Sequence, residues 1–320
     1  MEPRLEALYQ NVRKVIIGKD EVVKLAVTAL LARGHLLIED APGLGKTMLA
    51  RAIAQSLRAT FKRIQFTPDL LPSDVTGVTV FDPSHQRFEF FPGPVFAQVI
   101  LADEINRTSP RTQSSLLEGM EERQVSVDGK THLLPEPFFV VATQNPIELE
   151  GTYPLPEAQL DRFLLRLELG YPQADEEMRI LAEQVHEHPI HQLQPVMEVE
   201  NLLELQAEVR QVRVGPEVMR YIVSLVGATR ASPETRLGAS PRGALALMRA
   251  AQAHAFLLGF SFATPDSVKT VAPHVLAHRI LLEPQREYTG LSRKKLIGDI
   301  LKEIPVPTLP HDKVVHQVQK

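Results

Sequence analysis

The chain has 320 residues, with 35 Lys and Arg against 39 Asp and Glu, which gives a formal net charge of −4 at pH 7. This balance excludes a uniformly basic nucleic-acid-binding surface, although it leaves room for a local basic patch. The sequence contains no cysteine, which excludes disulfides, thiolate zinc sites and a cysteine nucleophile. The length predicts two domains and permits a substantial hydrophobic core.

The N-terminal segment and the longest apolar run differ from those of exported or membrane proteins. Residues 1–6 carry charges where a signal peptide requires an apolar stretch. The nearly apolar run 26–32 is shorter than the ~20 residues that a membrane span requires. We therefore expect a cytoplasmic protein with no membrane insertion.

The first 170 residues alternate short apolar runs with helical patterns, which predicts a parallel α/β sheet. Several runs are hydrophobic at nearly every position, as is typical of strands buried on both faces. The predicted strands are 36–39, 63–66, 99–103, 138–143 and 163–169, with helices that include 21–32, 47–57 and 111–122.

Beyond residue 172 the pattern becomes helical. Pro216, Pro241 and Pro265 stand where helices begin, because proline suits the first helical position. The predicted helices are 175–184, 202–211, 216–228, 241–256 and 265–276. This organisation predicts an α/β domain at 1–172, an all-α domain at 173–304 and a tail at 305–320.

A glycine-containing loop, Asp40–Thr47, connects the first predicted strand to a helix and resembles the Walker A phosphate loop. Asp40 stands where the common pattern has its first glycine. Backbone N–H groups of the loop and the helix N-terminus would surround the phosphates, Lys46 would reach the β- and γ-phosphates, and the Thr47 hydroxyl would bind Mg²⁺. The residues expected to contact the nucleotide here are Pro42, Gly43, Leu44, Gly45, Lys46, Thr47 and Met48.

Polar residues follow two further strands. The apolar strand 99–103 ends in Asp103 and Glu104, which resemble a Walker B pair. Asp103 would hold Mg²⁺ and Glu104 would polarise the attacking water. Asn145 follows the strand 138–143, where its amide could orient that water or could simply be a turn residue.

These elements and several longer stretches resemble the MoxR family of AAA+ ATPases over essentially the whole chain. The stretches are Ala102–Arg107, Gln113–Glu118, Met120–Val125, Ala142–Pro146 and Glu157–Phe163. The resemblance implies a three-layer α/β/α domain with a parallel five-stranded sheet, followed by a small all-α lid. An acidic residue at the position of Asp40 is familiar in this family.

The resemblance also implies roles for single residues. Asn145 matches sensor 1, Arg162 matches the arginine finger that reaches a neighbouring subunit, and Arg242 matches sensor 2 on the lid. Ile17 and Gly18 fall in the region that lines the adenine pocket. For either arginine the alternative is a surface salt bridge.

The sequence around Arg242 supports a phosphate partner independently of the resemblance. Ser240 suits a helix N-cap and Pro241 the first helical position. Arg242 would then lie in an exposed first turn, where a cation is unfavourable for the helix dipole.

Two hairpins are predicted from alternating patterns, 78–81 with 87–90, and 123–127 with 130–133 around Asp128-Gly129. Their positions match the helix-2 insert and the pre-sensor-1 hairpin of the AAA+ branch that contains MoxR. The resemblance implies that they project toward the ring pore or face and relay the nucleotide state to a partner. Alternatively, they cover the sheet or pack between subunits.

The expected function is hydrolysis of ATP with Mg²⁺ in a ring, expected to be hexameric, that remodels, assembles or matures a protein client. The family implies that the client could be a von Willebrand factor A-domain protein. Alternatives are a nucleic-acid motor such as a helicase, a metal-chelatase motor subunit, or an adaptor that binds ATP without turnover; Glu104 argues against the adaptor. The hairpin cations are offset by acids and the hairpins lack clustered aromatics, which makes nucleic acid a poorer match.

Overall fold

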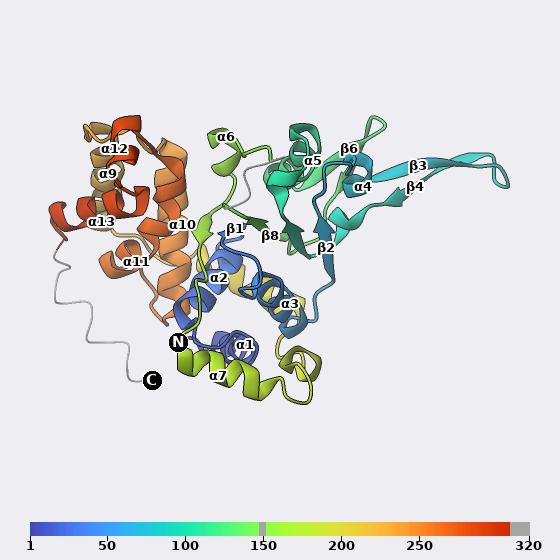
Figure 1. Ribbon diagram of the computed structural model, residues 1–320, viewed down its shortest axis with the longest axis horizontal. Helices are drawn as coiled ribbons and strands as arrows, with labels where there is room; N and C mark the ends of the chain where they lie inside the picture. The colour runs from blue at the N-terminus through green and yellow to red at the C-terminus, as the bar shows by residue number, and fades with distance from the viewer. Residues whose placement is uncertain (147–151, 308–320) are drawn as a thin grey trace.

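A parallel five-stranded sheet forms the centre of the N-terminal part of the computed structural model, which describes residues 1–146 and 152–307 (Figure 1). The strand order is β2-β5-β8-β1-β9, and every pairing is parallel. The strands are β1 (Leu36–Glu39), β2 (Phe61–Gln65), β5 (Val99–Asp103), β8 (Phe139–Gln144) and β9 (Leu165–Leu167). The predicted α/β class is confirmed.

Both faces of the sheet are buried at its central strands β5, β8 and β1, whose successive side chains point to opposite sides. Leu36 and Ile38 of β1 lie in one hydrophobic cluster with α1, α2 and α3, whereas Leu37 lies in a second cluster with α5. These helices are α1 (Pro3–Arg13), α2 (Asp20–Leu31), α3 (Lys46–Ser56) and α5 (Pro110–Glu122). Strands covered on both faces need apolar residues at every position, which explains the continuous runs in the sequence.

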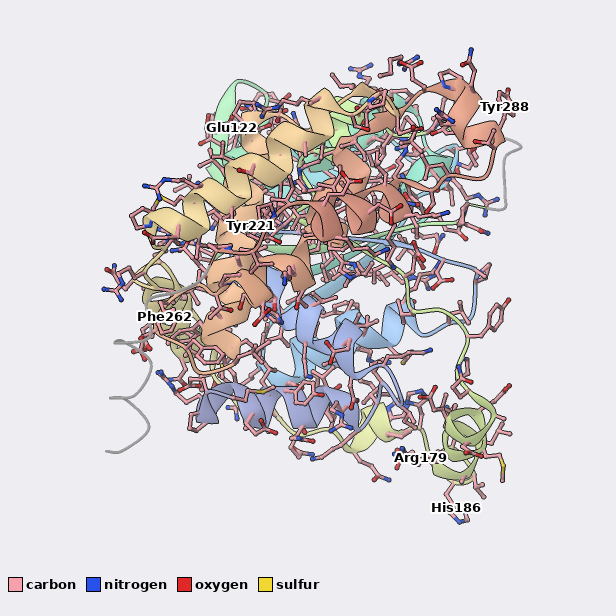
Figure 2. All side chains as sticks on the ribbon, turned by 90° about the vertical axis from the view of Figure 1, so that its left-hand side faces the viewer. Glu122, Arg179, His186, Tyr221, Phe262 and Tyr288 are labelled. Carbon is pink, nitrogen blue, oxygen red and sulfur yellow. The ribbon has the colours of Figure 1, made fainter. Side chains whose placement is uncertain are left out.

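The C-terminal part is helical and packs on α2. Gln206 donates a hydrogen bond from Nε2 to the carbonyl of Leu30 (2.7 Å), and the first hydrophobic cluster continues from the sheet side into this bundle. Tyr221 lies buried among these helices, whereas Tyr288 projects from their far end (Figure 2). The helices are α8 (Val199–Val209), α9 (Pro216–Ala231), α10 (Pro241–Leu257), α11 (Pro265–Leu276), α12 (Pro284–Tyr288) and α13 (Arg293–Glu303).

The predicted helix starts at Pro216, Pro241 and Pro265 are confirmed, since each is the first residue of its helix. The Ser240 hydroxyl accepts a hydrogen bond from the Gly243 N–H (3.4 Å), so the predicted N-cap is also confirmed. Shorter elements complete this architecture: α4 (Pro72–Thr76), α6 (Glu157–Leu160), β10 (Thr235–Leu237), β11 (Leu281–Leu282) and four 3-10 turns at 94–96, 105–107, 189–192 and 277–279.

The segment between the sheet and the helical bundle lies against the sheet-bearing part. It begins with α7 (Ala174–Glu183), which lies beside α1 (Figure 1). Farther along, Gln55 Nε2 donates to the carbonyl of Leu193 (2.7 Å), and Val196 N–H donates to the carbonyl of Ser56 (2.9 Å). The expected boundary at residue 172 stays a prediction, and these contacts favour a lid that begins after this segment. Most of the expected tail, residues 308–320, lies outside the described residues.

Both predicted hairpins are present as antiparallel pairs. They are formed by β3 (Gly77–Asp82) with β4 (Arg87–Pro92), and by β6 (Gln124–Val127) with β7 (Lys130–Leu133). The β3–β4 ribbon extends away from the body of the molecule (Figure 1).

The expectation that the hairpins lack clustered aromatics is wrong. Phe81 and Phe88 are opposite each other in the β3–β4 register, with ring centroids 5.2 Å apart in an edge-to-face arrangement. They are 49% and 71% exposed. Closer to the body, the Phe90 ring stacks on His132 with centroids 4.0 Å apart, because the two hairpins lie side by side. Cross-strand pairing thus gathers phenylalanines that are separated in the sequence.

Among the described ranges, no helix has the length and apolar character needed to cross a bilayer.

Candidate active site

The phosphate-loop residues stand at the carboxyl end of β1, immediately before α3. Gly43 and Gly45 have φ values of 85° and 91°, a left-handed conformation that disfavours other residues. A side chain at Gly43 would meet no atom within 4 Å, so the exposed Gly43 faces open space. Gly45 caps α3 without a side-chain hydrogen bond, which leaves the helix N-terminus available to an anion.

Lys46 begins α3 and lies close to three acidic groups. Its Nζ donates to the carbonyl of Asp40 at 2.5 Å. Burial lowers the pKa of Lys46, while the charges of Asp103, Asp40 and Glu104 raise it. The lysine is therefore held against the start of the loop, within range of the charges of Asp40, Asp103 and Glu104. Thr47 and Met48 follow in the first turn, and Leu44 and Met48 pack against the first hydrophobic cluster.

The departure at Asp40 has a structural explanation. One carboxylate oxygen accepts from the Ala41 N–H (2.9 Å) and the other from the Gly170 N–H (2.6 Å). Gly170 lies just past β9, so the side chain ties the phosphate loop to the chain leaving the sheet. Neither bond is available to a glycine.

Asp103 is buried at the end of β5, and both its oxygens are bonded. Thr143 donates its hydroxyl to Oδ1 (2.6 Å), and Arg63 donates to Oδ2 from Nε (3.0 Å) and Nη2 (2.6 Å). The Arg63 guanidinium, which comes from the neighbouring strand β2, therefore supplies a positive charge to this carboxylate.

Glu104 follows in a left-handed backbone conformation, with φ 57° and ψ 48°. This conformation is uncommon outside glycine and is typical of functional positions. Its N–H donates to the Thr143 hydroxyl (2.8 Å), and its Oε2 accepts from Gln65 Nε2 (2.8 Å) and Arg107 Nη1 (3.0 Å). These contacts fix where the carboxylate lies.

Asn145 shares this edge of the sheet. The register places Gln144 beside Glu39, and the Asp40 N–H donates to the carbonyl of Gln144 (3.3 Å). Asn145, the next residue, is buried beside the start of the phosphate loop. The structure therefore brings Lys46, Asp103, Glu104 and Asn145 to the carboxyl edge of one parallel sheet, where such folds bind ligands.

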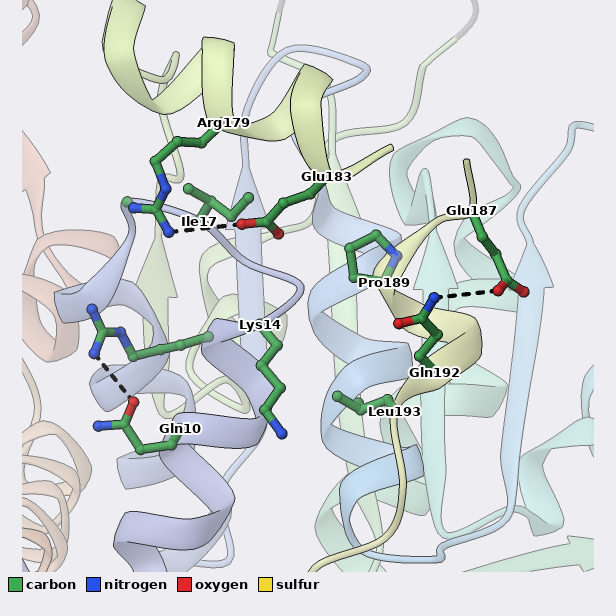
Figure 3. Close-up of a pocket in the computed structure, with 11 residues that line it drawn as sticks. Gln10, Lys14, Ile17, Arg179, Glu183, Glu187, Pro189, Gln192 and Leu193 are labelled. Carbon is green, nitrogen blue, oxygen red and sulfur yellow. Dashed lines mark hydrogen bonds and ion pairs between the residues drawn. The ribbon is translucent and has the colours of Figure 1, made fainter. Parts of the chain in front are cut away.

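Ile17 and Gly18 line a separate cavity of about 610 Å³ between α1, α7 and residues 189–193 (Figure 3). Ile17 is buried, and a side chain on Gly18 would meet Glu176 of α7. Lys19 Nζ donates to the carbonyl of Tyr171 (2.8 Å). Ile17 and Gly18 thus lie next to the segment that leaves the sheet, and their role in adenine binding stays a prediction.

Arg162 and Arg242 lie at the other end of the sheet. Arg162 precedes β9 and therefore stands at the amino edge, whereas the phosphate loop follows the carboxyl end of β1. The Leu164 N–H donates to the carbonyl of His35, which precedes β1. The residues just before β9 therefore lie beside the amino end of β1. Strands rise about 3.3 Å per residue, so the four residues of β1 separate the two edges by about 13 Å.

Both arginines form an ion pair with Glu121 near the end of α5. The Arg162 Nε–Oε2 distance is 3.2 Å and the Arg242 Nη1–Oε1 distance is 3.4 Å. They line a cavity of about 610 Å³ that is rich in guanidinium groups. Its arginines are Arg33, Arg123, Arg162, Arg210, Arg242, Arg249 and Arg279.

Sequence reasoning missed the residues that hold the acidic pair and the arginines. Arg63 and Gln65 alternate along β2, a spacing that points both side chains to one face. That spacing could have identified them once β2 was placed next to β5. Glu121 and Arg279 carried no usable signal, because their contacts join segments that are far apart in sequence.

The donor set at the carboxyl edge fits Mg²⁺. Thr47 and Asp103 offer a hydroxyl and a carboxylate, the hard oxygen ligands that Mg²⁺ uses together with phosphates and water. In the described part of the chain no three His, Asp or Glu side chains form a metal-binding group. With Thr47 and Asp103 as its protein ligands, a cation here would take its remaining coordination from the nucleotide and water.

Comparison with known proteins agrees with this geometry. The sequence profile of the ATPase family associated with various cellular activities (AAA) matches residues 35–165, and the AAA lid domain profile matches residues 227–304. The uncharacterised protein YeaC of Bacillus subtilis is 50% identical over 96% of both chains. Chaperone MoxR1 of Mycobacterium tuberculosis is 39% identical over 95% of this chain and 82% of its own. The crystal structure of a candidate ATPase from Cytophaga hutchinsonii has a TM-score of 0.88 and 36% identity, and covers 96% of both chains.

The two profiles follow each other in the order of the sheet and the helical bundle, and the similarity to MoxR1 extends over nearly the whole chain. The chain therefore belongs to the MoxR family of AAA ATPases.

Proposed function

We propose that this ATPase hydrolyses ATP with Mg²⁺ at a site completed by a neighbouring subunit, and that hydrolysis drives remodelling of a partner protein. The observation that carries the first part is the separation of the two sets of residues. Lys46, Asp103 and Glu104 stand at the carboxyl edge of the sheet, while Arg162 and Arg242 stand at the amino edge, about 13 Å away across β1. An arginine at the amino edge cannot reach the phosphates of its own chain.

Within one chain the chemistry belongs to the carboxyl edge. The phosphate loop and Lys46 would bind the β- and γ-phosphates, and Glu104 would accept a proton from the water that attacks the γ-phosphorus. Asn145 would orient that water. The bond to the β-phosphate oxygen breaks, giving ADP and inorganic phosphate. Mg²⁺, held by Thr47 and Asp103, would offset the charge of the phosphate oxygens when bound.

Arg162 and Arg242 would enter the site of the neighbouring chain and stabilise charge that develops on its γ-phosphate. Such a contact joins two different surfaces, so it is a heterologous interface that closes into a ring when the rotation permits. We propose a hexamer, in keeping with the family.

A protein client is supported by the β3–β4 ribbon. Val80, Phe81, Phe88 and Phe91 are exposed on a two-stranded element, although isolated ribbons of this kind are only marginally stable in water. Phe81 and Phe88 lie on one face of the ribbon, and Val80 and Phe91 lie on the other, because side chains alternate along a strand. Exposed apolar side chains gathered on a projecting element are typical of a protein contact. The similarity to a protein named chaperone MoxR1 points the same way, and a von Willebrand factor A-domain protein is a candidate client.

Two arginines of the hairpins lie close to acidic side chains, which weakens the case for nucleic acid as the partner. Arg87 lies 3.9 Å from Glu89, and Arg123 lies 3.4 Å from Glu136. Their charge is therefore largely offset at the positions where a phosphate backbone would pass.

Mixing two inactive variants tests the shared site. Lys46→Ala chains lack the phosphate contact but retain both arginines, whereas Arg162→Ala chains retain the phosphate loop. Each variant alone should be nearly inactive, and the mixture should recover ATPase activity at interfaces that combine intact halves. No recovery at any ratio, with both variants folded and associated, would contradict the proposal.

The client is tested with Glu104→Gln, which should bind ATP without hydrolysing it. Affinity capture from the native host uses this variant as bait and Lys46→Ala as the control that does not bind ATP. A partner protein should be enriched with Glu104→Gln and not with Lys46→Ala. Enrichment of DNA or RNA instead would favour the nucleic-acid motor.

A further inference from the structure

One carboxylate holds both arginines of the proposed shared site. Glu121 lies near the end of α5, and each of its oxygens serves one guanidinium: Oε2 that of Arg162 (3.2 Å) and Oε1 that of Arg242 (3.4 Å). Arg162 comes from the sheet-bearing part and Arg242 from the first turn of α10 in the lid. Glu121 therefore bridges the two parts of the chain at the point where the arginines meet.

All three side chains are accessible from outside. Their exposed fractions are 28% for Arg162, 38% for Glu121 and 73% for Arg242. Within residues 1–146 and 152–307, neither arginine forms another ion pair. A single exposed ion pair is weak because water competes for both partners, but here one carboxylate forms two such pairs.

The backbone on both sides of Arg162 is fastened to the lid by Arg279, whose side chain is 4% exposed. Its Nε donates to Asp161 Oδ1 (2.7 Å), and its Nη2 donates to the carbonyls of Asp161 (3.0 Å) and Phe163 (2.7 Å). His278 adds a contact to the Phe163 carbonyl (3.0 Å). Arg162 is thus attached to the same part of the chain that carries Arg242.

Two guanidiniums near one another repel, and the cavity they line holds five further arginines. A carboxylate placed between them offsets that repulsion, as a phosphate would. We propose that Glu121 is a positioning residue that keeps Arg162 and Arg242 together as a pair, so that they enter the neighbouring site as one unit. This inference rests on the proposed shared site.

Glu121 would act on catalysis only through the arginines of its own chain. Glu121→Gln removes the charge and keeps the shape, so the arginines should separate and reach the neighbour's phosphate less often. We expect kcat to fall about tenfold with KM for ATP little changed, because the phosphate loop that binds ATP belongs to another chain. Glu122→Gln is the matched control, since Glu122 is the next residue, is exposed and forms no ion pair among the described residues.

Mixed assemblies of the two inactive variants provide the decisive test. With Glu121→Gln on the Lys46→Ala chain, which donates arginines, the recovered activity should fall about tenfold. With the same change on the Arg162→Ala chain, which donates the phosphate loop, the recovered activity should match that of the parent mixture. An equal fall in both placements, or no fall in the first, would overturn the role of Glu121.

This design separates failure of the inference from failure of the proposed function. If the parent mixture recovers no activity, the shared site itself is wrong, whatever Glu121 does. A second measurement guards against misfolding: Glu121→Gln should have the same urea midpoint as Glu122→Gln. A third comparison introduces Arg242→Ala into both variants, and the difference in kcat between Glu121→Gln and Glu122→Gln should then become smaller. Equal losses with and without Arg242 would count against a paired action.

Discussion

The carboxylate of Asp40 accepts a hydrogen bond from the backbone N–H of Gly170 at 2.6 Å, and this bond joins the start of the phosphate loop to the chain leaving the sheet. The Ala41 N–H bonds to the other oxygen. Hydrogen bonds to a charged group contribute about 1.5–3 kcal/mol each. An acidic residue at this position therefore has a structural purpose that a glycine could not fulfil.

Replacing Asp40 by glycine should destabilise the protein and weaken nucleotide binding. We expect a loss of about 2 kcal/mol in the free energy of unfolding and a KM for ATP raised several-fold, because the loop loses its connection to Gly170. Urea unfolding and steady-state ATPase assays measure the two effects. Asp40→Asn keeps one acceptor oxygen and should be intermediate; a glycine variant as stable as the parent would show that the bond contributes nothing.

His35, at the amino end of β1, should make stability depend on pH. Its Nδ1 accepts from the Val140 N–H (3.1 Å), so Nε2 carries the proton and donates to the carbonyl of Met120 (3.1 Å). Burial lowers the pKa of His35 from 6.5 to about 4. Protonation would cost the bond to Val140, which explains why the folded protein resists it.

The sign follows from the two pKa values. Below pH 6.5 the unfolded chain takes up a proton that folded His35 does not, so stability is complete above pH 6.5 and falls as the pH is lowered toward 4, by about 3 kcal/mol. Urea unfolding between pH 7.5 and 4.5 should show this slope, and His35→Asn should reduce it. Burial also lowers the pKa values of His254, His274 and His278, so some slope remains in the variant. Parallel slopes in the two proteins would refute the assignment.

Arg279 should be among the residues most important for stability. Its removal would leave the half-buried Asp161 carboxylate and two carbonyls without this donor. We expect Arg279→Ala to lower the free energy of unfolding by about 3–5 kcal/mol. Arg279→Lys should also be costly, because an ammonium cannot reproduce the planar fork. Arg249→Ala is the control: Arg249 lines the same cavity but is exposed, so its loss should have little effect on the urea midpoint.

The β3–β4 ribbon should be dispensable for basal hydrolysis but required for the client. Phe81→Ser with Phe88→Ser removes the exposed ring pair without changing the strands, and deletion of residues 82–86 shortens the ribbon. In either case the basal ATPase rate should stay near that of the parent. When either change is combined with Glu104→Gln, capture of the client should be lost. Retained capture would show that the client binds elsewhere.

The sequence predicted the fold and the carboxyl edge well, because both depend on local patterns. The strand 99–103 has the predicted bounds, because four apolar residues followed by an acidic one are typical of a buried strand that ends at the edge of a sheet. The phosphate loop lies at the expected place for the same reason, as spacing along one segment determines its shape. The predicted strand 163–169 is longer than β9, which spans Leu165–Leu167. The residues at its two ends are apolar because they pack in the core outside the strand, Phe163 in the second cluster and Leu169 in the first.

Contacts between distant segments could not be predicted in this way. Glu121 and Arg242 are 121 residues apart, and Arg279 and Asp161 are 118 apart, so no periodicity connects them. The phenylalanine pair on the ribbon illustrates the same difficulty, since Phe81 and Phe88 meet only through the strand register. The roles of Arg162 and Arg242 came from family resemblance, and only the structure placed them together.

The placement of the acids and the arginines on opposite edges of the sheet also has a consequence for counting. If every working site needs two chains, a linear run of n chains holds n − 1 complete sites, and an isolated chain holds none. Turnover per chain would therefore grow with the length of the run and reach its full value only when the last chain meets the first. Specific activity measured against protein concentration would then report closure of the assembly.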